Sequence, residues 1–203
     1  MRCIGLSQRI CISEHNEKRD CLAHDWTRFL ATVGIRWVAL PNNETGALRI
    51  AEGLNLCGLV LTGGDDIGVF PERDATEFAL LHWSKRQYKP VVGVCRGFQV
   101  MYTWLGGTLQ AVQREQHVAT RHTISFSSGD KRMVNSYHTL APAPVYEQGF
   151  PLRPLAFCEE DESIEAAKCD LFFGMMWHPE RDPIIDERDI HTFRQYFSEA
   201  CYD

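Results

Sequence analysis

The segment PVVGVCRGFQ (residues 90–99) places one cysteine between two different chain patterns. An apolar run ends at Cys95, and the residues behind it, FQVMYTWLGG, have the composition of a helix. Gly93 and Gly97 each lie two residues from Cys95. A sharp strand-to-helix turn of this form lifts one side chain clear of the backbone, and its glycines let neighbouring chain pass closely. The pattern predicts a nucleophile elbow with Cys95 at its tip.

The helix that follows Cys95 would present free backbone N–H groups and a positive dipole to the sulfur. Both favour the thiolate, which is the reactive form of cysteine. The competing interpretation is a buried cysteine after a strand, with Gly93 and Gly97 as ordinary turn residues. The pattern by itself leaves both interpretations open.

A nucleophilic cysteine needs an oriented base. The segment MMWHPE supplies His178 at the end of an apolar run, with Glu180 two residues later. Residues i and i+2 of extended chain point to the same side, so Glu180 can hold the imidazole. Taken alone, each residue is more readily interpreted as structural: His178 as a strand-end surface residue and Glu180 as a solvated charge.

Acyl transfer also needs hydrogen-bond donors for the developing oxyanion. The elbow contributes the backbone N–H of Arg96. A second donor can come from TGGDD, which follows another apolar run, because ligands bind at the carboxyl ends of parallel strands. We expect the N–H of Gly64 to be that donor, against the alternative of a plain glycine turn at Gly63 and Gly64.

Composition limits the classes of function. The chain has 203 residues, 44% of them hydrophobic, and a formal net charge of −6. This length suits one domain over residues 1–203, with two small domains as the alternative. The acidic balance argues against a nucleic-acid partner. No apolar run is long enough to span a membrane, and the N-terminus has no signal-peptide pattern, which predicts a cytoplasmic protein. The eight cysteines form no C-x-x-C, so we expect no metal site.

The spacing of apolar residues predicts an alternation of strands and helices in the first two-thirds of the chain. The expected strands are residues 3–7, 35–40, 57–61 and 90–94. The expected helices are residues 19–34, 46–54, 76–87 and 98–107.

The last third has a different pattern. Strand-like segments at residues 122–126, 133–141, 153–158, 163–169 and 171–178 are separated by turns, and a helix at 185–200 carries Ile190, Phe193, Phe197 and Ala200 on one face. Apolar strands alternating with helices predict a parallel sheet covered on both faces. We therefore expect one α/β domain with a mixed, mostly parallel sheet flanked by helices and antiparallel strands at one side.

The segments GVCRGFQ and WHPE resemble the class I glutamine amidotransferase family, whose fold is flavodoxin-like. TGGDD, the helix with RDATEFALL, VNSYHTLAP and SIEAA follow in the same order, so the resemblance covers nearly the whole chain. CRG and VNSYH are more similar to the stand-alone γ-glutamyl hydrolases, such as γ-glutamyl-γ-aminobutyrate hydrolase, than to the glutaminase halves of synthetases.

This resemblance implies a role for each matching residue. Cys95 is expected to be the nucleophile, His178 the general base and acid, and Glu180 the carboxylate that orients it. Gly64 and Arg96 match the oxyanion-hole positions. Four further residues match positions that contact the glutamyl group: Gln99, Ser136, Tyr137 and His138. For His138 the alternative is a polar edge residue without a role in proton transfer.

The segment SQRICISEHNEKRDC resembles the opening of the γ-glutamyl-CDP-amidate hydrolases of capsular phosphoramidate synthesis. It follows the first strand and carries Arg9, Lys18 and Arg19, which would suit a diphosphate in the leaving group. The competing interpretation is a solvated loop.

Together these features predict a cysteine hydrolase that releases glutamate from a γ-glutamyl amide through a thioester, without metal or organic cofactor. The favoured substrate is γ-glutamyl-CDP-amidate. The alternatives are hydrolysis of another γ-glutamyl amide, a glutaminase subunit that passes ammonia to a synthetase, and a binding protein on the same fold. The sequence leaves the oligomeric state open.

Overall fold

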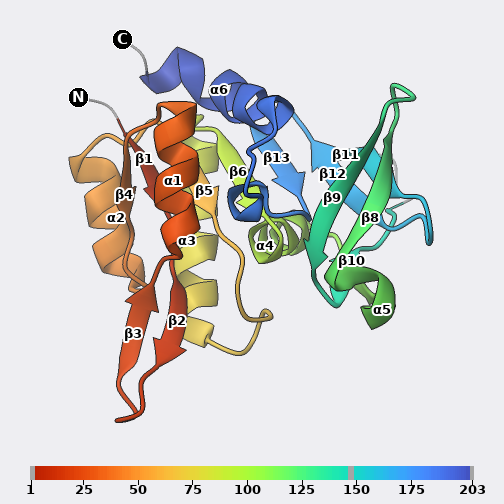
Figure 1. Cartoon of the computed structure of the whole chain (residues 1–203). Helices are drawn as coiled ribbons and strands as arrows, with labels where there is room; N and C mark the ends of the chain where they lie inside the picture. The colour runs from red at the N-terminus through yellow and green to blue at the C-terminus, as the bar shows by residue number, and fades with distance from the viewer. Residues whose placement is uncertain (1–2, 146–148, 202–203) are drawn as a thin grey trace.

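A nine-stranded mixed sheet forms the centre of the protein (Figure 1). The computed structural model describes residues 3–145 and 149–201, with side chains to residue 197. Five neighbouring strands are parallel, and in space they lie in the order β4 (Trp37–Ala39), β1 (Ile4–Leu6), β5 (Leu59–Leu61), β6 (Val91–Val94) and β13 (Phe172–Met175). Counted along the chain these are strands 2-1-3-4-5, the flavodoxin-like order. The α/β prediction is confirmed.

The other four strands continue the sheet from β13 in antiparallel pairs, also as predicted. They are β12 (Ile164–Lys168), β11 (Arg153–Cys158), β8 (Val118–Phe126) and β9 (Lys131–Tyr137). Short turns connect β8 to β9 and β11 to β12, which is the connection that antiparallel neighbours allow. This half of the sheet lies on the right of Figure 1.

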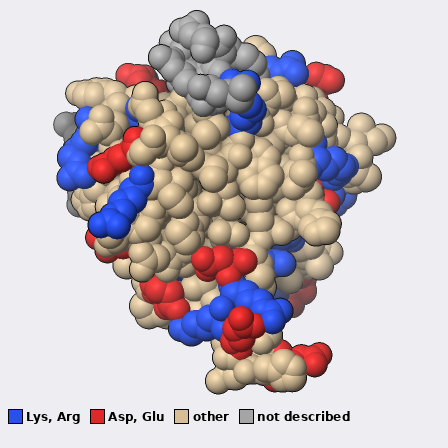
Figure 2. Space-filling model, turned by 90° about the vertical axis from the view of Figure 1, so that its left-hand side faces the viewer, with Lys and Arg blue, Asp and Glu red and all other residues tan. Residues whose placement is uncertain are grey.

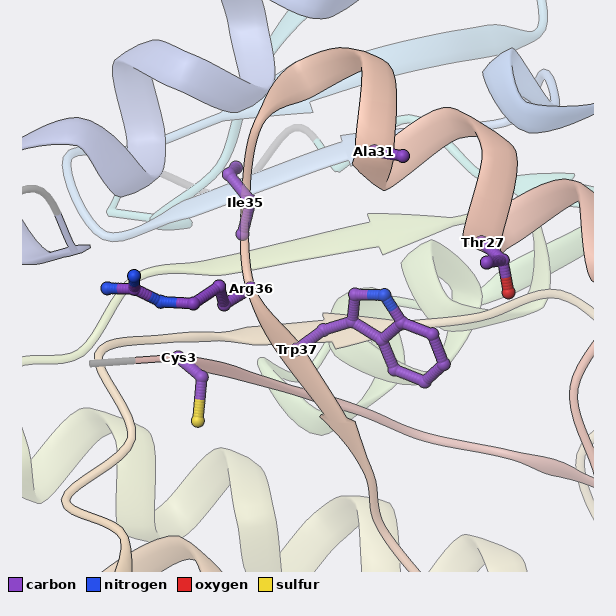
Figure 3. Close-up of a pocket in the computed structure, with 6 residues that line it drawn as sticks. All are labelled: Cys3, Thr27, Ala31, Ile35, Arg36 and Trp37. Atoms are coloured by element: carbon purple, nitrogen blue, oxygen red, sulfur yellow. The ribbon is translucent and has the colours of Figure 1, made fainter. Parts of the chain in front are cut away.

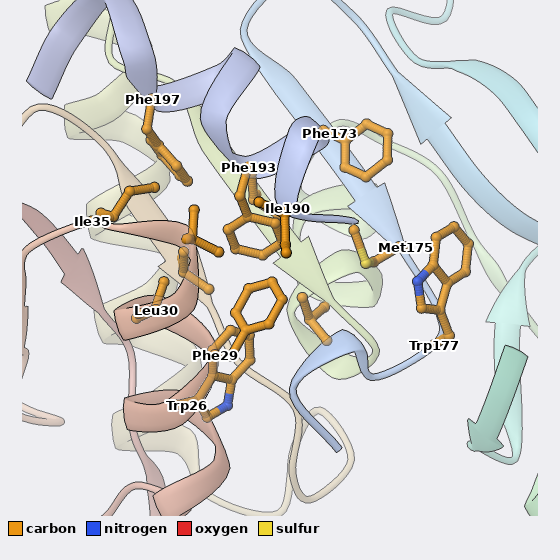
Figure 4. Packing of buried hydrophobic residues seen from close by; sticks show 14 of the residues in the cluster. Trp26, Phe29, Leu30, Ile35, Phe173, Met175, Trp177, Ile190, Phe193 and Phe197 are labelled. Atoms are coloured by element: carbon orange, nitrogen blue, oxygen red, sulfur yellow. The ribbon is translucent and has the colours of Figure 1, made fainter. Parts of the chain in front are cut away.

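Helices cover both faces of the parallel half. On one face lie α1 (His24–Val33) and α6 (Glu187–Cys201); on the other lie α2 (Glu44–Gly53), α3 (Pro71–Gln87) and α4 (Arg96–Trp104). Figure 4 shows Phe29 of α1 against Phe193 of α6, with ring centroids 4.7 Å apart. The buried Ile190, Phe193 and Phe197 confirm the predicted apolar face of α6. The side chain of Ala200 lies outside the described residues.

Two predicted helix starts are wrong: α3 begins at Pro71 instead of residue 76, and α1 begins at His24 instead of residue 19. Residues 19–23 do not belong to α1; instead β3 (Lys18–Cys21) pairs antiparallel with β2 (Arg9–Ile12) in a separate hairpin. Figure 1 shows this hairpin projecting away from the central sheet at the lower left. Its side chains are mostly exposed on both faces, so the alternation that marks a half-buried strand is missing from the sequence.

The remaining elements are short. β7 (Leu109–Ala111) and β10 (Leu140–Pro142) form a two-stranded sheet, so the predicted strand at 133–141 is divided between β9 and β10. α5 (Arg114–His117) leads into β8, and η1 (Pro179–Arg181) is a single 3₁₀ turn after β13. Within the described residues, none of the helices combines the length and the apolar character that a membrane crossing requires.

Candidate active site

Cys95 lies on a sharp turn at the carboxyl end of β6, directly before α4. Its φ of 52° is positive, a conformation that non-glycine residues adopt mainly at constrained sites. The N–H of Cys95 donates to the carbonyl of Met175 at 2.7 Å, which ties the turn to β13. A side chain on Gly97 would overlap the carbonyl of Leu61, and one on Gly93 would meet the backbone of Gly97. Both glycines are therefore required by close backbone approach, as the elbow pattern predicts.

His178 and Glu180 reach the same edge of the sheet from β13. Because β13 pairs parallel with β6, with Met175 opposite Val94, the residues after the two strands come together. His178 Nδ1 lies 2.7 Å from Glu180 Oε1, and both side chains are almost fully buried. The imidazole therefore has its second nitrogen, Nε2, available for Cys95.

The surroundings of His178 favour its charged form. Burial lowers the pKa, but the negative charges of Glu180 and Cys95 and hydrogen bonds to both side chains outweigh it and raise the pKa of His178 to about 9. The imidazole therefore carries a proton at neutral pH, between a carboxylate and a sulfur atom. A group in this state can serve first as a proton donor and then, once neutral, as a base.

Strand β9 fixes the position of His178 from the antiparallel side. The Asn135 side chain donates to the His178 carbonyl at 2.8 Å and accepts from the His178 N–H at 2.9 Å. The Tyr137 ring packs edge-on against the imidazole, with centroids 5.7 Å apart, and the Arg181 guanidinium lies over the Tyr137 ring. Asn135 and Arg181 also lie at the site and were not predicted. Asn135 is 43 residues from His178 in the chain, so no local pattern links the two. Arg181 directly follows Glu180 and could have been found from that position.

The two expected oxyanion donors come from neighbouring segments. Arg96 is the first residue of α4, where a backbone N–H has no partner within the helix. Gly64 follows β5 with a φ of 144°, which strongly favours glycine, and a side chain there would clash with Arg73. Its neighbour Gly63 lies directly beside the ring of His178, where a Cβ would stand 2.5 Å from Cε1.

A buried network of charges connects these two segments. Arg73 donates to the carbonyls of Thr62 and Gly63 and pairs with Glu77 at 3.0 Å; Glu77 also pairs with Arg96, whose other end meets Asp74. Burial opposes the ionisation of Glu77, but the two arginines prevail and hold its pKa below the usual value. Helix α3 thereby holds both the loop that contains Gly63 and Gly64 (the glycine loop) and the side chain of Arg96. The i, i+4 spacing of Arg73 and Glu77 was the only sequence signal for this network.

The residues expected near the glutamyl group separate into two sets. Gln99, one turn after Cys95, donates to the carbonyl of Leu140 at 2.7 Å, and Tyr137 is partly exposed beside His178. Ser136 and His138 have partners elsewhere: the Ser136 hydroxyl donates to the carbonyl of His117, and His138 faces Glu165. Consecutive residues of an extended strand point to opposite sides, so the structure does not bring Ser136, Tyr137 and His138 together over Cys95.

The three basic residues of the hairpin also differ from one another. Arg9 and Arg181 line a cavity of about 20 Å³ together with His178 and Glu180, and the Cβ of Arg9 lies beside Gly64. Lys18 pairs with Glu72 and Arg19 with Glu17, both at the exposed surface. Figure 2 shows positive and negative residues side by side on the projecting hairpin at the bottom of the view. Only Arg9 is placed by these contacts next to the predicted catalytic residues.

Two larger pockets lie elsewhere. One, of about 500 Å³, is lined by Cys3, Thr27 and Trp37 among others (Figure 3). Cys3 precedes β1 and Trp37 begins β4, so this pocket is at the amino ends of the parallel strands, opposite Cys95. Burial also raises the pKa of the Cys3 thiol, which disfavours a nucleophile. The second pocket, of about 820 Å³, is lined by Pro90 and Leu171 among others. These two residues directly precede β6 and β13, so this pocket also lies at the amino ends of the parallel strands.

Comparison with known proteins shows the family of the chain. The family model for Peptidase C26 matches residues 3–180. The chain belongs to this family. Among its relatives, the γ-glutamyl-CDP-amidate hydrolase of Campylobacter jejuni is 29% identical over 96% of this chain and 97% of its own length. One of the subunits of the glutamine-hydrolysing GMP synthase of Methanospirillum hungatei is 28% identical over 77% of this chain and 79% of its own length.

Solved structures share the fold of this Peptidase C26 member. A glutamine amidotransferase from Thermotoga maritima superposes with a TM-score of 0.67 at 14% identity, covering 97% of this chain and 84% of that one. A second, from Methylobacillus flagellatus, gives 0.61 at 17% identity, covering 98% and 75%. The predicted class I glutamine amidotransferase-like fold is confirmed.

Proposed function

We propose that this protein is a cysteine-dependent hydrolase of γ-glutamyl amides. The observation that carries the proposal is the arrangement of Cys95 on a constrained elbow, with the buried His178–Glu180 pair on the adjacent strand end. A nucleophile, a base in contact with it and a carboxylate that orients the base form the minimal set for covalent acyl transfer.

The residues suggest a two-step reaction. The Cys95 sulfur attacks the γ-carbonyl carbon, and the oxyanion that forms is stabilised by the N–H groups of Gly64 and Arg96. The His178 imidazolium gives its proton to the leaving nitrogen, the C–N bond breaks, and a γ-glutamyl thioester remains on Cys95. His178, now neutral, takes a proton from water; the hydroxide attacks the thioester, glutamate leaves, and the thiolate–imidazolium pair is restored. These steps require no metal or organic cofactor.

For the leaving group we favour a nucleotide, so that γ-glutamyl-CDP-amidate gives cytidine diphosphoramidate and glutamate. Two observations support this choice. The Campylobacter jejuni relative with this activity in its name aligns with nearly the full length of this chain. Arg9 lies beside the glycine loop, and among the described residues it has no carboxylate partner, so its charge is available for a phosphate.

A panel of substrates tests the proposal directly. Purified protein would be assayed for glutamate release from glutamine, γ-glutamyl-γ-aminobutyrate and γ-glutamyl-CDP-amidate, with Cys95→Ala as the inactive control. We expect hydrolysis of γ-glutamyl amides by the isolated protein, with the highest kcat/KM for the nucleotide-linked substrate. If hydrolysis required an added synthetase, the protein would instead be a glutaminase subunit of that synthetase. Equal kcat/KM values for the three substrates would support a γ-glutamyl hydrolase but contradict a nucleotide as the leaving group.

A further inference from the structure

A second group of titratable side chains is buried in the antiparallel half of the sheet, and the proposed reaction does not use it. It comprises His117 at the end of α5, His122 in β8, His138 directly after β9 and Glu165 in β12. All four are buried, and Glu165 is completely so. α5, β8, β9 and β12 lie on the right of Figure 1. Three imidazoles around one buried carboxylate need a partner that satisfies them all.

The contacts within this group are too long for good hydrogen bonds. Glu165 Oε1 lies 3.3 Å from His138 Nε2 and 3.7 Å from His117 Nδ1, and Glu165 Oε2 lies 3.4 Å from His122 Nε2. N–H···O bonds are normally about 2.7–3.2 Å long. Among the described residues, these three nitrogens and both carboxylate oxygens are buried without a hydrogen-bond partner. Each such group is costly, and several together in one place call for an explanation.

The separations of Glu165 from His138 and His117 are close to those of ligands around a metal ion. Zinc binds imidazole nitrogen at about 2.0–2.1 Å and carboxylate oxygen at about 2.0–2.2 Å. In a tetrahedral complex these bond lengths put neighbouring ligand atoms about 3.3–3.5 Å apart, too far for a good hydrogen bond. The ligand atoms of His117, His138 and Glu165 all lie within 4.8 Å of one another. Shifts of a few tenths of an ångström would bring the 3.7 Å pair into this range.

The outer contacts of His117 fit the same interpretation. Its other nitrogen, Nε2, lies 3.0 Å from a carboxylate oxygen of Asp161, which aims Nδ1 at Glu165. A metal-bound histidine almost always donates its second N–H to a carboxylate, carbonyl or water in this way. The carbonyl of His117 accepts both the Ser136 hydroxyl and the His138 N–H, so the two ligands are fixed relative to each other.

We propose that His117, His138 and Glu165 bind one Zn²⁺ ion, with His122 beside the fourth position. Imidazole and carboxylate ligands suit this ion, and the complete burial points to a structural rather than a catalytic site. His138 follows the strand whose Asn135 and Tyr137 hold His178. The ion would therefore tie the end of α5, the end of β9 and β12 together behind the predicted catalytic histidine.

Metal analysis of the folded protein tests this proposal without any substrate, so the result is independent of the proposed function. Protein purified from zinc-supplemented cells is expected to contain about one zinc per chain. Glu165→Gln, which keeps the shape of the side chain, is expected to lose at least about nine-tenths of it. The control His191→Gln changes an exposed histidine of α6 and is expected to keep it.

A refolding experiment covers the case in which a variant does not fold. Wild-type protein unfolded with a chelator and refolded with Zn²⁺ is expected to have a Tm about 5 °C or more above protein refolded without it, because an ion bound only by the folded state stabilises that state. Equal Tm values together with zinc below about one-tenth per chain would overturn the proposal. The ligand atoms of His117, His122 and Cys158 also lie within 4.8 Å of one another and form an alternative set of ligands. Loss of zinc in Cys158→Ser together with its retention in Glu165→Gln would overturn the assignment of Glu165 as a ligand.

Discussion

The charge of His178 determines how the predicted reaction responds to pH. Its pKa of about 9 means that the protonated form, which would donate to the leaving nitrogen, persists through neutral pH and is lost as the pH rises through about 9. Glu180 is a principal cause of this raised pKa, and its Oε1 is 2.7 Å from Nδ1. Removing its charge should therefore move the loss of activity to lower pH.

We expect kcat/KM of the wild type to fall above about pH 9 and that of Glu180→Gln to fall at a pH closer to 6.5, the usual pKa of histidine. The deficit of the variant relative to the wild type should grow between about pH 6 and pH 9. The measurement is kcat/KM for a γ-glutamyl amide across this range. A basic limb at the same pH in both proteins would show that Glu180 does not set the charge of the catalytic base.

At the scale of elements, the elbow depends on the contact between β5 and α4. Gly97→Ala would place a Cβ on the carbonyl oxygen of Leu61, which is backbone and cannot rotate away. We expect a loss of about 1–3 kcal/mol in the free energy of unfolding and a large fall in activity. The control is Gly53→Ala, at the end of α2, where a Cβ would meet nothing within 4 Å.

Denaturant unfolding of the two variants gives the comparison. Gly53→Ala should be neutral or stabilising by up to about 1 kcal/mol, because alanine is favoured over glycine in helices. If Gly97→Ala were as stable and as active as Gly53→Ala, the close packing of α4 on β5 would have no role in shaping the site.

Helix α3 contributes through its buried ion pairs. Glu77→Ala would leave Arg73 and Arg96 in a dry environment without their shared carboxylate, and such a loss destabilises by about 3–5 kcal/mol. The effect should be far larger than that of Glu52→Ala, which changes an exposed residue of α2. Thermal or denaturant unfolding measures both. A Glu77→Ala protein within about 1 kcal/mol of wild type would contradict a structural role for the network.

How much the sequence could predict differs from element to element. β5, β6 and β13 are continuously apolar and buried. Their pattern and their order in the chain were therefore enough to predict the fold and the positions of Cys95 and His178. The hairpin formed by β2 and β3 is mostly exposed on both faces, so the alternation typical of a half-buried strand is missing from its sequence. The wrong start of α1 followed from this, because residues 19–21 pair with β2 instead of extending the helix.

Contacts between distant segments were beyond the reach of local patterns. Asn135 and His178 are 43 residues apart in the chain, and Arg73 reaches the glycine loop only because α3 packs behind it. The buried histidine cluster was also invisible to local patterns, because His117, His138 and Glu165 do not have the short sequence spacing of known metal-binding motifs. The absence of C-x-x-C therefore excluded one kind of metal site and left others unaddressed.

At the scale of the whole molecule, Arg9 brings the exposed hairpin to the edge of the predicted active site. If Arg9 contacts a phosphate, Arg9→Ala should raise KM for γ-glutamyl-CDP-amidate by about tenfold or more, since a hydrogen bond to a charged group contributes about 1.5–3 kcal/mol. Hydrolysis of glutamine should barely change. Lys18→Ala and Arg19→Ala should have smaller effects, because those side chains are already paired with Glu72 and Glu17.

The measurement is the ratio of kcat/KM for the two substrates in each variant, with Arg49→Ala, an exposed arginine of α2, as the control. An unchanged ratio in Arg9→Ala would contradict the proposal that the leaving group contains a nucleotide. It would leave the γ-glutamyl hydrolase itself intact.

The most direct test of the central claim is to trap the covalent intermediate. Protein mixed with a γ-glutamyl substrate and quenched in acid within one turnover would be digested and analysed by mass spectrometry. We predict one γ-glutamyl group on the peptide that contains Cys95, and none on that peptide in Cys95→Ala. Turnover without this adduct on Cys95, or an adduct on another cysteine together with activity in Cys95→Ala, would contradict the assignment of Cys95 as the nucleophile.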